Sequence, residues 1–222
     1  MIERDDKLQQ LKFFYDALLI KDASVLHHQL DVCRVACSLA KAMALSPKNR
    51  QLIRLVSLYH DIGKLGVPKK ILFKASPLTI KEKEIIKRHP IIGAEMFKQC
   101  KSSLKITGTN MICEAILQHH EWYNGKGYPY GLKGKEINFL SRVVAVADAF
   151  SAMTTERIYC KARRPADAID EIQKCSGTQF DPEVVEVLLE GEWWDYYKLC
   201  KMTVTEQYLD YQLDNQACNL FH

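Results

Sequence analysis

Apolar residues recur every three or four positions along most of this chain, as on the buried face of an amphipathic helix. This spacing predicts a first helix over residues 8–19 and a second over about residues 25–45. Ser46-Pro47 is typical of an N-cap followed by proline at the first helical position, so it predicts a third helix, which Gly63 ends. The first third of the chain is therefore predicted to be helical.

The same pattern continues to the C-terminal end. Thr79 and Glu82 form a capping box that begins another helix, and the His89-Pro90 step is predicted to break or kink it, because a residue before proline avoids the α conformation. Further helices are predicted from about residue 110, over the apolar segment 139–153, and after the Asp181-Pro182 cap signal. The aromatic stretch after residue 191 is expected to be helical and packed on the core, with a loose tail.

These elements predict an all-α protein with a single helical-bundle domain. Residues 1–24 are expected to form an N-terminal helical extension, residues 25–190 the domain itself, and residues 191–222 an aromatic helix and tail packed on it. The aromatic helix also has the character of a dimer surface, although core packing is the favoured interpretation.

Composition narrows the possible partners. The chain has 222 residues, 47% of them apolar, and a net charge of +4. Its basic residues are spread out, with no basic stripe interleaved with aromatics, which fits a small anionic ligand and argues against a nucleic acid polymer. The N-terminus lacks a signal-peptide core and no run approaches the ~18 apolar residues of a membrane span, so a cytoplasmic protein is expected. Eight irregularly spaced cysteines without a C-x-x-C pair predict free thiols.

Imidazole and carboxylate side chains at helix ends and in apolar segments carry the candidate chemistry. Asp148 lies within VVAVADAF, where a buried carboxylate needs a cation, a metal or hydrogen-bond donors. His119 and His120 point about 100° apart on a helix, so one narrow apolar stripe cannot hold both. Each histidine alone is typical of an ordinary core or surface position, but together they predict a site for iron, manganese or zinc. The candidate ligands are His28, His60, Asp61, His89, His119, His120 and Asp148.

Several ordered motifs resemble one known family. They are HDIGK at residues 60–64, a His-Pro step followed by Gly93, HHE at residues 119–121 and GYP at residues 127–129. The chain resembles the HD-GYP family, a branch of the HD superfamily of metal-dependent phosphohydrolases, over about residues 26–189. The resemblance implies an all-helical fold, a centre of two or three metal ions, often iron, and hydrolysis of cyclic dinucleotides, above all cyclic di-GMP, to pGpG or GMP.

The resemblance also implies how the ligands are shared between two metal ions. His28, His60, Asp61 and Asp148 would hold one ion, and Asp61, as a bridging carboxylate, would hold the second together with His89, His119 and His120. Spacing back from HDIGK favours His28 as the first ligand, with His27 and Asp31 as alternatives. A water shared by the two ions would become hydroxide at neutral pH and attack the phosphodiester.

Four further residues are assigned to the substrate. Lys64 is expected to face the scissile phosphate, although a solvated lysine at a helix C-terminus is the alternative. Tyr128, in the loop NGKGYP, is expected to stack on or hydrogen-bond to a nucleotide, and the alternative is a loop that only covers the metal site. Arg157 is expected to bind phosphate, and Ser151 is placed in the substrate pocket.

The chain departs from the family pattern at four positions. Ser151 replaces a frequent aspartate, Cys160 replaces an expected basic residue, and Asn124 replaces an aspartate. Ser24 stands where members with a third metal carry glutamate, so two metal ions are predicted. These departures keep two alternatives open. One is a weak or inactive module that binds a cyclic dinucleotide, a signalling protein or a second copy, and the other is an HD phosphohydrolase acting on another nucleotide phosphate.

Overall fold

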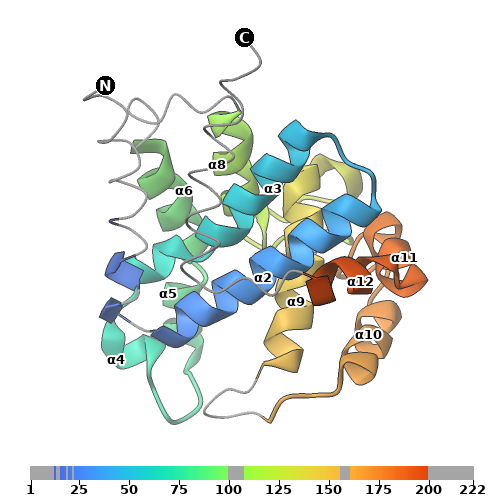
Figure 1. The fold of residues 1–222 in the computed structure, drawn as a ribbon. Helices are drawn as coiled ribbons and strands as arrows, with labels where there is room; N and C mark the ends of the chain where they lie inside the picture. Colours follow the sequence, from blue (N-terminus) through green and yellow to red (C-terminus); the bar gives the residue numbers. More distant parts are fainter. Residues whose placement is uncertain are drawn as a thin grey trace.

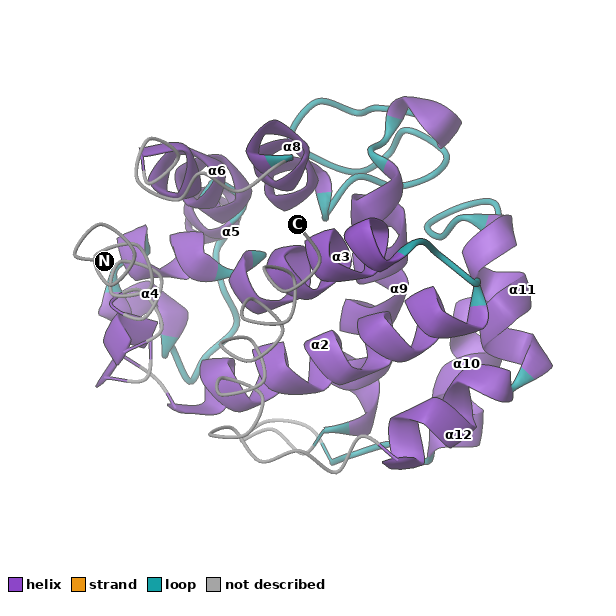
Figure 2. Cartoon of the chain, turned by 45° about the horizontal axis from the view of Figure 1, so that its top comes forward, coloured by secondary structure: helices purple, strands orange, loops and turns teal. Residues whose placement is uncertain are grey.

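The computed structural model describes residues 23–99, 108–155 and 161–199, together with residues 13, 16–18, 20 and 21. Within these residues the regular elements are helices, accompanied by two isolated β-bridges (Figures 1 and 2). The prediction of an all-α fold is therefore confirmed.

Three helices form the centre of the molecule. They are α2 (Ala23–Ala42), α3 (Pro47–Tyr59) and α9 (Phe139–Thr154), and α2 packs against both of the others. Their facing sides bury apolar residues such as Leu39, Val56 and Val143. Burial of this kind is the main stabilising contribution, at about 1.5–3 kcal/mol for each large aliphatic side chain. This core therefore fixes α2, α3 and α9, each of which contributes to the site described below.

A second group of helices lies at one side of this centre. It contains η1 (Ile62–Gly66), α4 (Lys69–Leu72), α5 (Ile80–Ile86), α6 (His89–Gln99) and α8 (Thr109–Gln118). Helix α6 packs against both α8 and η1. Phe97 of α6 and Ile112 and Ile116 of α8 are fully buried, which joins this group to the core.

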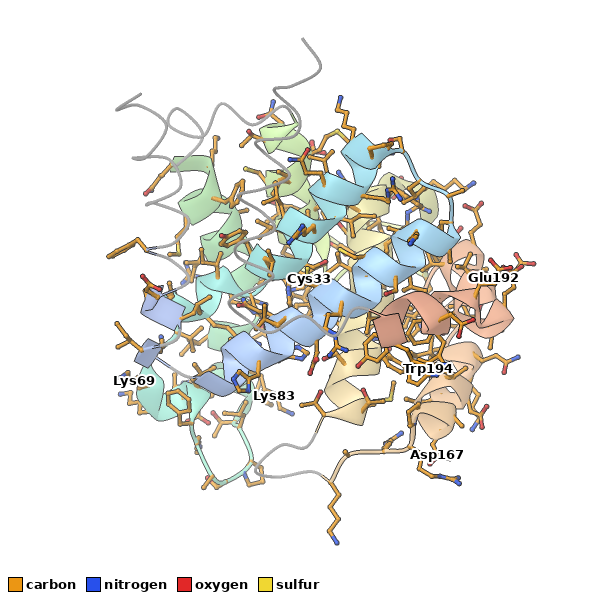
Figure 3. The ribbon with its side chains drawn as sticks, viewed as in Figure 1. Cys33, Lys69, Lys83, Asp167, Glu192 and Trp194 are labelled. Atoms are coloured by element: carbon orange, nitrogen blue, oxygen red, sulfur yellow. The ribbon has the colours of Figure 1, made fainter. Side chains whose placement is uncertain are left out.

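The C-terminal helices cover the other side. They are α10 (Pro165–Lys174), α11 (Pro182–Glu190) and α12 (Glu192–Leu199). Asp167 and Glu192 point outward from α10 and α12 (Figure 3). Trp193 is buried, and its Nε1 donates to the carbonyl of Leu188 at 2.8 Å. Helix α12 packs on α2, while the predicted tail lies outside the described residues.

The predicted helix boundaries agree with the structure where capping signals were strong. Ser46 accepts a hydrogen bond from the Asn49 amide, and the capping box of Thr79 and Glu82 is complete. Helix α5 ends at Ile86 and α6 begins at His89, so a break is present, but it precedes the predicted His89-Pro90 step and His89 itself is helical. The third helix was predicted to continue to Gly63, which is wrong. It ends at Tyr59, and the chain turns through η1 to lie against α6.

Two smaller expectations concern membranes and thiols. In the described part of the chain, no helix combines the length and apolar character needed to cross a membrane. Among the cysteines of that part, Cys33, Cys37, Cys113 and Cys175, none forms a disulfide bond.

Candidate metal centre

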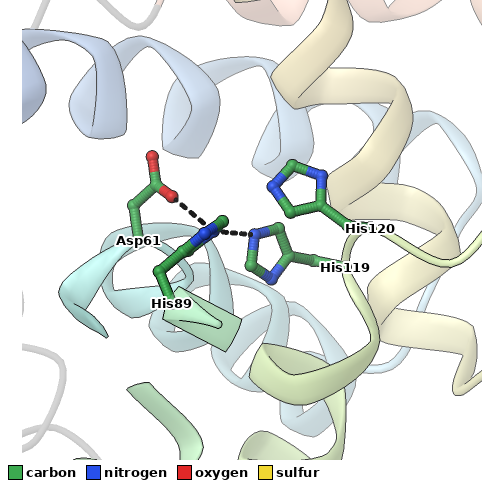
Figure 4. A group of neighbouring side chains, drawn as sticks. All are labelled: Asp61, His89, His119 and His120. Atoms are coloured by element: carbon green, nitrogen blue, oxygen red, sulfur yellow. Dashed lines mark hydrogen bonds and ion pairs between the residues drawn. The ribbon is translucent and has the colours of Figure 1, made fainter. Parts of the chain in front are cut away.

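The predicted ligands lie together, although they come from distant parts of the chain. His28 is on α2, Asp148 is on α9, and the others stand at or beside the ends of α3, α6 and α8. In each of two groups, one ligand atom per residue lies within 4.8 Å of every other. The first group is His28, His60 and Asp148. The second group, drawn in Figure 4, is Asp61, His89, His119 and His120.

Backbone carbonyls orient three of the imidazoles. The Nδ1 atoms of His60, His89 and His119 lie 2.7, 2.8 and 2.6 Å from carbonyl oxygens three residues earlier in the chain. A carbonyl oxygen accepts and never donates, so each Nδ1 must carry the proton. Each Nε2 therefore presents a lone pair to the centre, which is the arrangement of a histidine that binds metal.

The nitrogen and oxygen atoms that face inward carry no protons, so they cannot form hydrogen bonds with one another. The Nε2 atoms of His89 and His119 face each other at 3.2 Å (Figure 4). Nε2 of His60 is buried without a hydrogen-bond partner among the described residues. Oδ1 of Asp61 lies 3.1 Å from Nε2 of His89, and both atoms are acceptors when Nδ1 of that ring carries the proton. Because unsatisfied buried acceptors are costly, the cluster is suited to holding a cation. Imidazole nitrogens with carboxylate oxygens fit a divalent transition metal.

His28 rather than its alternatives reaches the cluster. Its Nε2 lies 2.8 Å from Oδ1 of Asp148, and its Nδ1 lies 3.0 Å from Oγ of Ser151. His27 is exposed, and Asp31 contacts Arg34 at 3.3 Å. The histidine favoured by its spacing from HDIGK is thus the one that lies in the cluster.

Ser151, which was assigned to the substrate pocket, lies beside a proposed metal ligand. Its side chain is 1% exposed and lies against Nδ1 of His28, on the side of the ring away from Asp148. It therefore contacts a proposed ligand, and burial leaves it no open face for substrate. A hydroxyl in this place orients the ring, as outer partners of metal-binding histidines do.

Of the other residues assigned to the substrate, Lys64 and Tyr128 contact proposed metal ligands. Nζ of Lys64 forms an ion pair with Oδ2 of Asp61. Tyr128 stacks on His120, with ring centroids 4.8 Å apart and planes at 27°, and Nζ of Lys87 lies 5.7 Å from the Tyr128 centroid. Arg157, like the departure at Cys160, lies outside the described residues.

Electrostatics keep the carboxylates charged and two of the imidazoles neutral. Burial alone would raise the pKa of Asp61, but Lys64 and His60 together hold it well below its usual range. Burial likewise opposes ionisation of Asp148, yet the hydrogen bond from His28 leaves its pKa lowered. Burial lowers the pKa of His119 strongly and that of His120 to about 4. The site thus presents anionic carboxylate oxygens beside the neutral nitrogens of His119 and His120, which are the forms that bind metal.

The metal-free protein is expected to lose stability as the pH falls from about 6.5 to about 4. In this window an unfolded chain protonates His119 and His120, whereas the folded chain keeps them neutral because their pKa values are lowered. His60, whose pKa is raised despite burial because of Asp61, opposes the trend in part. Denaturant midpoints at pH 7 and pH 4.5 measure the effect. His120→Asn should flatten the dependence, and a midpoint that rises on acidification would contradict the expectation.

Glu121 is a structural residue of the site that was not singled out from the sequence. Its buried carboxylate accepts hydrogen bonds from the amides of Tyr130 at 2.7 Å and Leu132 at 3.1 Å. Gly127 packs so closely that a Cβ there would lie 2.2 Å from the Trp122 nitrogen. The GYP loop is thereby fastened over the histidine pair, and HHE was the signal that could have revealed the role of its glutamate.

Glu121→Gln is expected to destabilise the protein by about 1–3 kcal/mol, because a buried charged acceptor of two amides becomes a neutral one. Thermal or denaturant unfolding measures the change. Glu136→Gln is the matched control, since Glu136 accepts from the Lys133 amide at 2.9 Å on the exposed surface. Equal losses of stability in both variants would show that the buried hydrogen bonds of Glu121 contribute no more than the exposed one of Glu136.

Comparison with known proteins places this geometry in a family. The HD domain model matches residues 12–184. A cyclic di-GMP phosphodiesterase of Thermotoga maritima is 37% identical over 180 residues, which cover 80% of this chain and 48% of that protein. The cyclic di-GMP phosphodiesterase PA4108 of Pseudomonas aeruginosa is 35% identical over 164 residues, which cover 74% of this chain and 38% of that protein. The chain thus spans about half, or less, of the length of these relatives.

Solved structures agree on the fold. A cyclic GMP-AMP specific phosphodiesterase of V. cholerae superposes with a TM-score of 0.58 at 19% identity, covering 90% of this chain and 52% of that one. The HD domain of the L. monocytogenes phosphodiesterase PgpH, in complex with cyclic-di-AMP, gives a TM-score of 0.58 at 17% identity. The match covers 86% of this chain and 98% of that one. Family model, identities and motifs agree: this chain belongs to the HD domain family, in its HD-GYP branch.

Proposed function

We propose that this chain is a metal-dependent phosphodiesterase that hydrolyses cyclic dinucleotides, with cyclic di-GMP as the favoured substrate and pGpG or GMP as the product. The observation that carries the proposal is the inward-facing cluster, in which imidazole Nε2 atoms and two ionised carboxylates converge. Relatives of 35–37% identity are named cyclic di-GMP phosphodiesterases, which supports this substrate class.

The residues fit two divalent metal ions, with iron favoured over manganese and zinc. His28, His60 and Asp148 would hold one ion, and His89, His119 and His120 the other. Asp61 would serve both, because its Oδ2 lies 3.5 Å from Nε2 of His60 and its Oδ1 lies 3.1 Å from Nε2 of His89. When bound, such ions supply a nucleophilic oxygen at neutral pH and stabilise charge on the phosphate.

The open side of the centre is where the substrate phosphate would enter. The side chains of Asp148 and Lys64 are 21% and 24% exposed, whereas that of Asp61 is 3% exposed. The Lys64 ammonium would offset charge that develops on the phosphate oxygens. Tyr128, stacked on His120, forms a wall where a nucleotide base would lie. Arg157 remains a proposed phosphate contact.

The departures from the family pattern leave the proposed ligand set complete. Ser151 is not among the groups that converge on the centre, so its replacement of aspartate removes no ligand from either group. We therefore favour turnover over a binding-only module. We also retain residues 25–190 as the proposed catalytic unit, between a proposed extension over residues 1–24 and a proposed C-terminal helix and tail over residues 191–222.

One further proposal concerns the cellular compartment. The free thiols of the described cysteines fit a reducing compartment, so we place the protein in the cytoplasm. No surface of the described residues identifies a signalling protein or a second copy of this chain as a partner.

The proposal is tested with the purified full chain loaded with Fe(II) or Mn(II). Cyclic di-GMP, 3'3'-cGAMP, cyclic di-AMP and a nucleoside monophosphate are incubated with it, and the products are separated by chromatography. We expect cleavage of a cyclic dinucleotide to linear products. Binding without cleavage would overturn the proposal in favour of a receptor, and hydrolysis of the monophosphate alone would overturn it in favour of another phosphohydrolase.

A further inference from the structure

Lys21 makes three contacts that neither the motifs nor the proposed mechanism explains. Its Nζ donates to the backbone carbonyls of Lys64 at 2.7 Å, Leu65 at 2.8 Å and Val67 at 2.7 Å. An ammonium group has three donors, and protein oxygens take all of them here. The side chain is half-buried, and burial lowers the pKa of Lys21, with further lowering by Lys69.

The three carbonyls belong to the segment that carries Lys64. They lie in η1 and at its C-cap, Val67, where a helix leaves carbonyls without internal partners. Of the three, the Lys64 carbonyl also accepts from the Val67 amide at 3.1 Å. The Lys21 ammonium therefore joins three carbonyls at the end of this short turn. These carbonyls lie 43 to 46 residues after Lys21 in the chain.

Two opposite contacts thus define where η1 lies. On one side Gly63 approaches α6 so closely that a Cβ there would lie 1.9 Å from the His89 carbonyl oxygen. At the other end the turn is held by Lys21. Asp61 begins the turn as its N-cap, and Nζ of Lys64 pairs with Asp61 across it. The place of the Lys64 ammonium therefore depends on both contacts.

A solvated lysine near a helix end would be an ordinary charge effect worth only a few tenths of a kcal/mol to about 1 kcal/mol. Such a lysine keeps water on its ammonium, because the group is strongly hydrated. At Lys21 three carbonyls replace this water at short distances. The geometry is that of a cation enclosed by backbone oxygens, and it points to a fixed position for the turn.

We propose that Lys21 is a positioning residue, which holds the η1 turn so that the Lys64 ammonium stands at the open side of the metal centre. This inference rests on the proposed function, because it assigns Lys64 its part in turnover. It also links the segment ahead of α2 to the catalytic turn, although no motif includes that segment.

The test compares Lys21→Met with Lys69→Met in the full chain. Lys69 is an exposed lysine of α4 close enough to affect Lys21 electrostatically. Lys21→Met is expected to lower kcat by about 10- to 100-fold, because small displacements of a catalytic group have effects of this size. KM and metal content should change little, and Lys69→Met should match the wild type. Lys21→Gln, whose amide still donates, is expected to be intermediate.

A double-mutant cycle with Lys64→Met separates positioning from plain stability. If Lys21 acts through Lys64, Lys21→Met should cost less than about twofold in kcat once Lys64 is replaced, because coupled residues are not additive. An equal loss in both backgrounds would overturn the proposal.

Hydrogen exchange of a peptide over residues 61–67 gives a readout that needs no activity. The Val67 amide, which donates to the Lys64 carbonyl, should exchange faster in Lys21→Met than in Lys69→Met. Unchanged exchange would overturn the proposal even if the variant were slow. A wild type that cleaves no cyclic dinucleotide would instead refute the proposed function, and exchange would still decide whether Lys21 holds the turn.

Discussion

Asp61→Asn is expected to lower the metal content of the purified protein from about two ions per chain to below about one, and to reduce cyclic dinucleotide hydrolysis by about 10³-fold or more. The reason is the position of the carboxylate between the two ligand groups, 3.5 Å from Nε2 of His60 and 3.1 Å from Nε2 of His89. Asparagine removes the negative charge while leaving the size of the side chain nearly unchanged.

The measurement is metal analysis of desalted protein together with kcat/KM on the same preparation. Asp31→Asn is the matched control, because Asp31 is also an aspartate near the site, but it pairs with Arg34. The control should keep both metal and activity. Two firmly bound ions in Asp61→Asn would contradict its assignment as the shared carboxylate.

Gly63→Ala should have the second large effect, a destabilisation of about 3 kcal/mol or more with loss of metal. A Cβ at this position would lie 1.9 Å from the His89 carbonyl oxygen and 2.5 Å from the Gly93 nitrogen. Both neighbours are backbone atoms, so η1 and α6 would have to separate. That separation would move Asp61 away from His89, which is why stability and metal binding should fall together.

Gly66→Ala is the control for this substitution. The three atoms nearest to a Cβ there all belong to the side chain of Ile92, with Cγ2 closest at 3.0 Å, so no backbone has to move and a smaller loss is expected. Unfolding midpoints and metal content of the two variants give the comparison. Equal midpoints for Gly63→Ala and wild type would show that the close approach of η1 to α6 is not required.

Helices with strong end signals or long apolar periodicity could be predicted from the sequence, whereas two short helices, α4 and α10, were not. Ser46, Thr79 and Asp181 accept backbone amides at helix starts, as their sequence context indicates. Helix α4 has only four residues, too few for a periodic pattern, and α10 begins after Arg164, whose side chain makes no cap. The end of α3 depends on packing of η1 against α6, which local sequence does not specify.

The proposed ligands could be selected from the sequence because imidazoles and carboxylates in apolar surroundings are costly there without a cation. The contacts that orient these ligand side chains could not be predicted in this way. The contact of Ser151 with His28 joins helices 123 residues apart in the chain, and the loop contacts of Glu121 depend on the path of residues 124–132. Such contacts depend on tertiary structure and leave no periodic trace.

The most direct test of the central claim is a metal titration of the wild-type chain, with turnover of cyclic di-GMP followed on the same samples. We expect metal-free protein to be inactive and hydrolysis to rise as loading passes from about one to about two ions per chain. Protein that binds two ions without cleaving any cyclic dinucleotide, or that cleaves one in the presence of excess chelator, would contradict this claim.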